Sequence, residues 1–339
     1  MILSIQYLRA IASILVVLSH IAWKNIQAGG STMHWWHEAG TFGVDIFFII
    51  SGFIMVYITA NMHQQAKGVR NFLKKRFIRI IPLYWFYTLI ALAIFFLMPE
   101  KVNSAGGDTQ ILKSFFLLPL QSKEDYLVGV GWTLHYEFLF YILFSFGLLL
   151  SRKMGDITVS SFLLFSIAYA LFIPMQGMSY IFYSFLNVIF IEFLLGMFLY
   201  HILRKIPIIH WSISLLSVAV GVFLFSHFFT DHTLIGVHRI DTAISAFLIC
   251  FGIISLEYVW KAKEFKLLSK IGDASYSIYL LHPFVLVAVV MFNEKLKEVL
   301  PQNEYFLIVL MFIVSLISGF ISHIWIEKPL IKITKKLFG

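Results

Sequence analysis

Arg9 and His20 are the first two side chains whose types and spacing could do chemistry. They lie in one long apolar segment, eleven residues apart. That spacing is about 1100° of helical rotation, so only about 20° separates their directions, and about 16 Å separates them along the axis. Ionisable groups inside an apolar span are costly and are therefore functional candidates. The structural alternative is a snorkelling arginine and a histidine that hydrogen-bonds two packed helices.

Two carboxylates interrupt other apolar segments. Asp45 is expected in the first turns of the second segment, and Glu137 less than two turns into the fourth, which is otherwise aromatic. An imidazole titrates near neutrality, and a carboxylate can orient it and stabilise its cation, so His20 with these acids suits proton abstraction. For Asp45, a helix cap or an outer-end charge is the alternative interpretation.

Arg76 and Arg79 form a second group, with Arg9, at the expected inner face. They are three residues apart and share a helix face if that segment is helical. Guanidinium groups bind phosphates through fork-shaped, charge-assisted hydrogen bonds. Two separate groups therefore suit a long cofactor, with its phosphates inside and its reactive end deep in the membrane. Plain topology charge is the alternative for these arginines.

The elements that must position these side chains follow from the composition. Of 339 residues, 60% are hydrophobic and 13% charged, about half the charged share of a soluble globular chain. This excludes a disordered chain and most soluble folds, and favours a bilayer. We predict an all-α, polytopic membrane helical bundle of about ten transmembrane helices. They are expected at residues 5–23, 41–60, 80–98, 132–150, 157–174, 180–203, 211–229, 240–259, 274–293 and 305–325.

Charge placement predicts the orientation of the bundle. The net charge is +8, and most of the Lys and Arg residues fall in alternate loops and the tail. By the positive-inside rule both termini are cytoplasmic, and the basic balance needs no nucleic acid. The polar stretch 99–127 is expected to be a loop. Residues 1–339 are thus interpreted as one integral membrane domain, and the single cysteine, Cys250, excludes an intramolecular disulfide.

Several segments together resemble the acyltransferase-3 family of membrane acyltransferases. Arg9 and His20 match its Arg-x10-His signature. The further resemblances, in chain order, lie at Phe47–Phe53, Arg76–Tyr84, Trp132–Tyr141, Gly272–Pro283 and Glu327–Pro329. Thr133 stands where the family usually has Ser. The opening Gln6–Ala12 is most similar to the exopolysaccharide-production branch, and the chain resembles stand-alone members without a soluble SGNH-like domain.

The resemblance implies an O-acetyltransferase of the bacterial plasma (inner) membrane. Such an enzyme moves an acyl group, usually acetyl, from cytoplasmic acetyl-CoA to a hydroxyl of an extracytoplasmic carbohydrate. Exopolysaccharide, O-antigen, a lipid-linked glycan and a small sugar all remain open as acceptors. The resemblance gives His20 a catalytic role and Arg9, Arg76, Arg79 and Tyr84 an acyl-CoA role. Acyl-CoA, the carbohydrate and membrane lipids are the expected partners, and no metal is expected.

Several other predicted site residues have both a functional and a structural interpretation. Trp132, Tyr136 and Tyr141 could stack on a sugar ring or belong to an interfacial aromatic belt. His282 could line the substrate tunnel or make a structural hydrogen bond. Asp273 is expected to cap the helix that follows it, and Ser51-Gly52 to permit close helix packing.

Two questions stay open at this stage. The rival class is a transporter or flippase for a free or lipid-linked glycan, which has the same composition; against it, no two-half repeat is visible. The route is also open, because His20 could act as a base or carry the acyl group itself. The sequence names neither the acceptor, the oligomeric state nor a partner protein.

Overall fold

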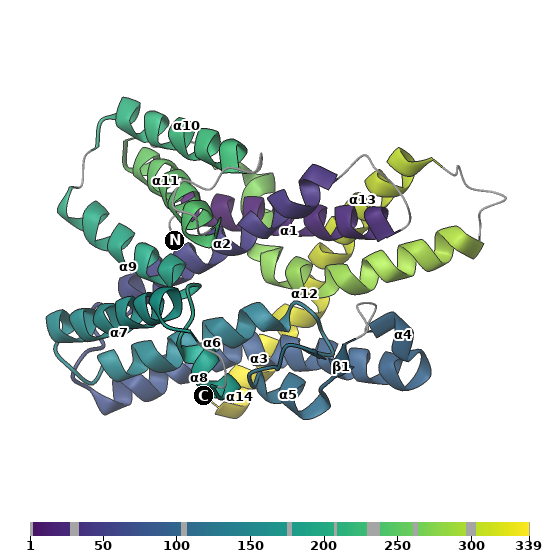
Figure 1. The fold of residues 1–339 in the computed structure, drawn as a ribbon, viewed down its shortest axis with the longest axis horizontal. Helices are drawn as coiled ribbons and strands as arrows, with labels where there is room; N and C mark the ends of the chain where they lie inside the picture. Colours follow the sequence, from purple (N-terminus) through teal and green to yellow (C-terminus); the bar gives the residue numbers. More distant parts are fainter. Residues whose placement is uncertain are drawn as a thin grey trace. The chain divides into compact units, whose positions relative to one another are not determined.

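The computed structural model of the chain describes residues 3–27, 34–102, 107–174, 178–206, 209–228, 238–259, 264–295 and 303–338. These residues are almost entirely helical (Figure 1). The longer helices are α1 (Leu3–Gln27), α2 (His34–Ile58), α3 (Ala66–Leu97), α6 (Gly131–Gly147), α7 (Arg152–Phe172), α9 (Phe190–Lys205), α10 (Trp211–Phe228), α11 (His238–Val259), α12 (Lys266–Lys295), α13 (Glu304–Ser322) and α14 (Lys328–Phe338). The shorter elements are α4 (Pro99–Val102), β1 (Asp108–Thr109), α5 (Ile111–Phe116), β2 (Glu124–Asp125), α8 (Tyr180–Phe185) and a π-helical turn, η1 (His323–Glu327).

The chain divides into two compact units that interleave along the sequence. The first unit contains residues 1–47 and 205–329, and the second contains residues 48–204 and 330–339. Helix α2 contributes to both units, since the boundary falls between Phe47 and Phe48. The expectation of one membrane domain stays a prediction.

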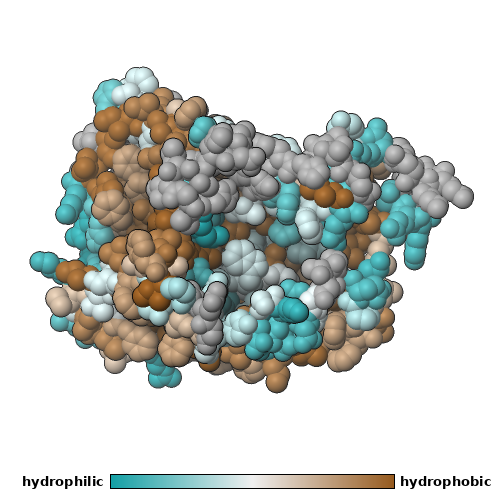
Figure 2. Space-filling model, in the orientation of Figure 1, coloured by the Kyte–Doolittle hydropathy of each residue, from teal (hydrophilic) through white to brown (hydrophobic). Residues whose placement is uncertain are grey.

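Within the described ranges, eight helical stretches are long and apolar enough to cross a membrane. The other two predicted spans are also helices: α6 has 17 residues and α10 has 18. Apolar side chains cover much of the surface seen in Figure 2, including α10 at the upper left, where Leu216 and Phe223 are each 64% exposed. Apolar surface on this scale suits lipid contact. The chain is a multi-pass helical membrane protein, as predicted; the side on which its termini lie stays a prediction.

Several helices begin earlier than their apolar stretches. Helix α3 starts at Ala66 instead of residue 80, so Arg76 and Arg79 do share a helix face. Helix α2 starts at His34, which places Asp45 about three turns inside instead of in the first turns. Helix α12 starts at Lys266, so the prediction that Asp273 caps it is wrong. Hydropathy finds the apolar part of a helix, whereas in α3 and α12 the helix-forming residues Lys and Arg extend the helix beyond that part.

The predicted helix at 180–203 is interrupted between α8 and α9. Ser166 of α7 donates a hydrogen bond from Oγ to the carbonyl of Phe185 (2.7 Å) and accepts one from the N–H of Asn187 (3.1 Å). The side chain of Asn187 accepts from the N–H of Ile189 (3.0 Å). Backbone groups freed inside a membrane must find protein partners. The side chains of Ser166 and Asn187 supply these partners, so specific hydrogen bonds within the second unit stabilise the break.

The core of the first unit joins α1, α12 and α13. Val17 and Ile21 of α1 pack in one buried cluster with Ile278 and Leu286 of α12 and Met311 of α13. The backbones of α1 and α12 also meet closely, because a Cβ at Gly272 would overlap the carbonyl of Gln6. Small residues at such crossings are how membrane helices approach each other. This packing fixes α12 against the helix that carries Arg9 and His20.

Candidate active site

His20 and His282, here called the histidine pair, meet inside the first unit. Nε2 of His282 lies 3.2 Å from Nδ1 of His20, and the ring centroids are 4.8 Å apart. Helix α1 presents His20 from its third quarter, and α12 presents His282 one residue before Pro283. His282 is fully buried, whereas His20 keeps part of its surface accessible. The structure therefore brings together two predicted site residues that are 262 positions apart in the sequence.

Backbone carbonyls fix the proton positions of the pair. Nδ1 of His282 lies 3.1 Å from the carbonyl of Ile278. The His282 ring also has a hydrogen-bond contact with the backbone of Tyr279. Pro283 has no N–H and leaves the Tyr279 carbonyl without its helical donor. A carbonyl only accepts, so Nδ1 of His282 carries the proton and its Nε2 is an acceptor in the neutral ring.

The proton position of His20 follows from the same argument. Nδ1 of His20 lies 3.0 Å from the carbonyl of Val16 and faces the acceptor Nε2 of His282. Nδ1 of His20 therefore carries the proton and donates to these two acceptors. In the neutral ring this leaves the lone pair on Nε2 of His20. The arrangement can remove a proton from a hydroxyl at that nitrogen.

Helix α2 is packed tightly against α1 beside His20. A Cβ at Gly40 would overlap Ser19, and one at Gly43 would overlap the carbonyl of Ala12. Ser19 donates a hydrogen bond from Oγ to the carbonyl of His37 (2.6 Å). The turn of α1 that carries His20 is therefore held by direct backbone contact with α2.

Asp45 is paired with an arginine that the sequence analysis did not single out. The Asp45 side chain is 5% exposed, and its Oδ1 lies 3.3 Å from Nη2 of Arg239 on α11. Among the described residues, the hydrogen-bond contacts of His20 are with Val16 and His282. The orienting role expected of Asp45 or Glu137 stays a prediction.

Glu137 lies in a polar cluster of the second unit, here called the arginine cluster: Ser51, Arg76, Glu137 and Tyr141. Tyr141 donates a short hydrogen bond to Oε1 of Glu137, and Ser51 of α2 donates to the same oxygen at 3.3 Å. The guanidinium of Arg76 lies 5.8 Å from the centre of the Tyr141 ring, within cation–π distance. Sequence reasoning placed Arg76 and Glu137 in separate groups, but Tyr141 joins them.

The arginine cluster leaves hydrogen-bonding capacity unused. Nε of Arg76 is buried and has no hydrogen-bond partner among the described residues. Arg79 lies about one turn further along α3 and is partly exposed, as is Arg9 on α1 in the first unit. A buried donor without a partner is unusual in a folded protein and suits an acceptor supplied by a ligand.

The other predicted contact residues have structural partners. Tyr84 is fully buried and donates from its hydroxyl to the carbonyl of Ser114 (2.7 Å), anchoring the segment before α6. That segment, expected to be a plain loop, contains α5 and a pair of short strands. Tyr141 is 2% exposed, whereas Trp132 is 39% exposed at the start of α6. Tyr136 is half-buried, and its hydroxyl accepts a hydrogen bond from Asn187 (2.9 Å). Trp132 is therefore the most exposed of the three aromatics proposed for sugar stacking.

The structure also reveals buried ionisable residues that sequence reasoning missed. Glu192 of α9 is fully buried, and Asp241 of α11 is 1% exposed. Glu327 accepts hydrogen bonds from Ser277 (2.7 Å) and from Nδ1 of His323 (2.8 Å), and it is also fully buried. Each interrupts or ends an apolar segment, so the rule for ionisable groups inside membrane spans would have flagged them.

Fold and site define the class as a multi-pass helical membrane protein with a buried histidine pair and a separate arginine cluster. Residues 2–324 match the family profile described as the acyltransferase domain. The chain therefore belongs to the acyltransferase-3 family, as the resemblance predicted, and by class it is a membrane acyltransferase.

Three relatives give the family context. The exopolysaccharide production protein ExoZ of Rhizobium meliloti is 29% identical over 306 residues, which covers 86% of this chain and 90% of that protein. The peptidoglycan O-acetyltransferase OatA of Listeria monocytogenes is 28% identical over 165 residues, or 44% of this chain and 24% of that protein. The acyltransferase MdmB of Streptomyces mycarofaciens is 29% identical over 160 residues, or 44% of this chain and 40% of that protein. No solved structure matches the chain.

Proposed function

We propose that this protein is an O-acetyltransferase of the bacterial inner membrane. It transfers acetyl from cytoplasmic acetyl-CoA to a hydroxyl of an extracytoplasmic carbohydrate. Family membership supports acyl transfer, and the near full-length relative named for exopolysaccharide production supports a polysaccharide acceptor. The relative named as a peptidoglycan O-acetyltransferase supports acetyl as the group transferred.

The histidine pair carries this proposal. His282 accepts the Nδ1 proton of His20 in a hydrogen bond, so Nε2 of His20 presents a lone pair to the sugar hydroxyl. As His20 removes the hydroxyl proton, the oxygen attacks the thioester carbonyl. The new C–O bond forms, the C–S bond breaks, and the CoA thiolate takes the proton from His20. His282 is a positioning residue in this scheme, comparable to the group that orients the base in a catalytic triad.

Phosphate recognition is assigned to Arg9, Arg76 and Arg79. The unused Nε donor of Arg76 supports its role, since a phosphate or thioester oxygen would satisfy it. Ser51 and Tyr141 would then hold Glu137 as a fixed negative charge near Arg76. Tyr84 and Tyr141 take no part in direct binding in this proposal, because their hydroxyls have protein partners.

An acetyl-histidine intermediate is the competing route, in which Nε2 of His20 attacks the thioester first. Incubating the purified protein with labelled acetyl-CoA and no acceptor separates the two routes. Direct transfer predicts no label on the protein. Label on wild type that is absent from His20→Ala would replace direct transfer with the covalent route.

The test of the function itself is acyl-CoA consumption by the purified protein in liposomes, read as free thiol. A transporter or flippase would consume none while moving glycan. Mass analysis of cell-surface glycans, with and without the protein, then identifies the acceptor. A difference of one acetyl group is expected, and identical glycan masses would contradict the proposed acceptor class. The break between α8 and α9 does not favour transport, because its backbone groups are bonded to Ser166 and Asn187.

A further inference from the structure

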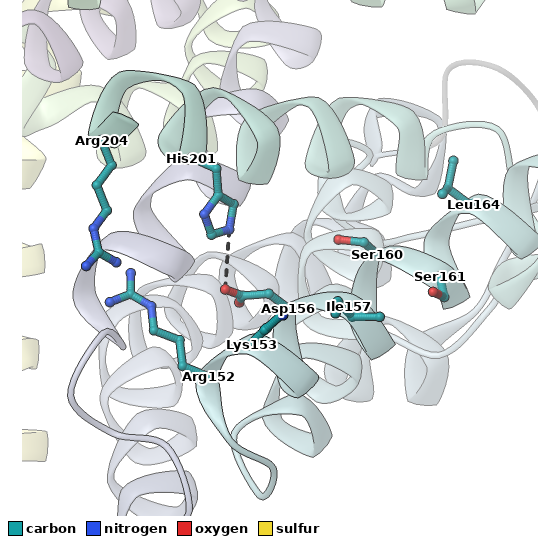
Figure 3. Close-up of a pocket in the computed structure, with 9 residues that line it drawn as sticks. All are labelled: Arg152, Lys153, Asp156, Ile157, Ser160, Ser161, Leu164, His201 and Arg204. Atoms are coloured by element: carbon teal, nitrogen blue, oxygen red, sulfur yellow. Dashed lines mark ion pairs between the residues drawn. The ribbon is translucent and has the colours of Figure 1, made fainter. Parts of the chain in front are cut away.

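An open cavity lies in the second unit, between α7 and the C-terminal end of α9 (Figure 3). Its volume is about 620 Å³, and basic side chains from both helices line one end. None of its residues belongs to the histidine pair or to the arginine cluster. The cavity, here called the α7–α9 pocket, therefore needs its own explanation.

Two guanidinium groups converge in this pocket. Figure 3 shows the side chains of Arg152 and Arg204 pointing toward one another from the two helices. Arg152 is held in place by Tyr200: its Nη2 donates to the tyrosine hydroxyl (2.9 Å), and its guanidinium lies 5.7 Å from the ring centre. Lys153 adds a third positive charge to the lining. Converging like charges repel, so the arrangement favours an anion between them.

The single carboxylate of the pocket is already engaged. Asp156 lies 3.3 Å from Nε2 of His201 on α9 (Figure 3). Three basic side chains, Arg152, Lys153 and Arg204, also outnumber this one carboxylate in the lining. The arginine end of the pocket therefore keeps a positive balance, and a phosphate group is the anion that forked guanidinium donors bind best.

The other end of the pocket is lined by Ile157 and Leu164, which are 49% and 56% exposed, together with Ser160 and Ser161 (Figure 3). From Arg152 to Leu164 helix α7 rises about 18 Å, which is close to the length of a lipid acyl chain. A positive end joined to an apolar wall of that length matches an anionic amphiphile. Basic pockets between membrane helices are typical sites for acidic lipid headgroups.

We propose that the α7–α9 pocket binds an anionic phospholipid, with its phosphate between Arg152 and Arg204 and one acyl chain along Ile157 and Leu164. The proposal is independent of the acyl-transfer reaction. A phosphate ester is also present in acyl-CoA, which is the second source of the same chemistry. The apolar wall favours the lipid, because the phosphate-bearing end of CoA has no acyl chain to place there.

Native mass spectrometry of the purified protein, titrated with phosphatidylglycerol, tests the site. We expect phosphatidylcholine with the same chains to bind more weakly. The double variant Arg152→Gln with Arg204→Gln should bind phosphatidylglycerol about 30-fold more weakly, since each basic residue contributes about fivefold. The matched control, Lys67→Gln with Arg70→Gln, removes the same charge from exposed positions of α3 and should bind as wild type does.

A steric variant tests the apolar end separately. Leu164→Trp should weaken the binding of long-chain phosphatidylglycerol several-fold and leave a short-chain form unaffected. This variant keeps both arginines, so it remains informative if the double variant folds poorly.

Three results would overturn the proposal. Equal binding of both lipid classes, or equal losses in the pocket and control variants, would indicate a general charge effect. Displacement of phosphatidylglycerol by adenosine 3′,5′-bisphosphate would assign the pocket to CoA phosphates instead. A Leu164→Trp variant that binds long and short chains as wild type does would remove the acyl-chain contact.

Discussion

The histidine pair and the arginine cluster satisfy their polar groups in opposite ways. In the pair, two neutral rings bond to backbone carbonyls and to each other, and one ring stays partly accessible. In the cluster, Glu137 is held by Ser51 and Tyr141, while Arg76 keeps a buried donor without a described partner. The pair is complete without a ligand, whereas the cluster is not.

This difference matches the two proposed roles, catalysis for the histidine pair and ligand binding for the arginine cluster. A base must have one proton position and a free lone pair before substrate arrives, which the carbonyls behind His282 and His20 provide. A binding group gains most when the ligand satisfies donors that the protein leaves open. We therefore expect changes in the histidine pair to lower kcat, and changes in the arginine cluster to raise KM.

The largest effect is expected for His20→Gln, which keeps a polar side chain of similar reach but removes the base. Turnover of acetyl-CoA should fall about 10³-fold, the scale of a lost general base. CoA affinity should be unchanged. Isothermal titration with CoA and a thiol-release assay measure the two quantities, and retention of more than a tenth of wild-type turnover would contradict the role of His20.

A smaller effect, on KM instead of kcat, is expected for Arg76→Ala. Loss of a charge-assisted contact of about 1.5–3 kcal/mol corresponds to a rise of about 10- to 100-fold in KM for acetyl-CoA. Arg76→Lys should recover little, because an ammonium lacks the forked donors. The neighbouring Lys75→Ala, at an exposed position, is the control. A fall in kcat with KM unchanged would contradict the proposed difference between the histidine pair and the arginine cluster.

The histidine pair also depends on close helix approach, which Gly40→Ala tests. The added Cβ would overlap Ser19 and push α2 away from α1. Overpacking of this kind costs about 1–3 kcal/mol of stability. Gly129→Ala is the matched control, because a Cβ there has nothing within 4 Å. Unfolding in mixed detergent measures both; equal stabilities would show that the α1–α2 contact is looser than the structure indicates.

The smallest effect is expected outside the spans, at the Lys113–Glu124 pair (2.5 Å). Partial burial raises the pKa of Glu124, but hydrogen bonds from Lys113 and from the N–H of Gln121 outweigh it and leave the pKa below its usual 4.5. When folding lowers the pKa of a carboxyl group, the ionised group stabilises the fold at pH values above its pKa in the unfolded state. That stabilisation is lost as the pH falls through the pKa of the folded state.

Glu124→Gln should therefore lower the free energy of unfolding by up to about 1 kcal/mol at pH 7. The difference from wild type should shrink as the pH falls below 4.5. Thermal unfolding across pH measures it, with the exposed Glu100→Gln as control. A difference that grows toward acid pH would show that the carboxylate destabilises the fold.

The sequence predicted the helices well because each span needs a long apolar run, and such runs are visible without structural data. It placed helix ends poorly, as at Ala66 and Lys266, because polar helix formers carry no hydropathy signal. The break at Asn187 was also missed, since partners from α7 outside the segment make it possible.

The site was predicted in its members but not in its pairings. His20 and His282 each interrupt an apolar run, yet their contact depends on how α12 packs against α1. Arg76 and Glu137 were assigned to different depths, and the ring of Tyr141 that joins them has no signal in spacing. Arg239, the partner of Asp45, lies at the edge of its predicted apolar stretch, and the sequence alone did not indicate a role for it.

A double-mutant cycle on the histidine pair tests the central claim most directly. His282→Ala should lower kcat about 10- to 100-fold, as loss of an orienting partner does, and His20→Ala about 10³-fold. If the two rings act as one unit, the double variant should be no slower than His20→Ala alone. Losses that multiply would show that His282 acts independently of His20, and would contradict the proposed catalytic pair.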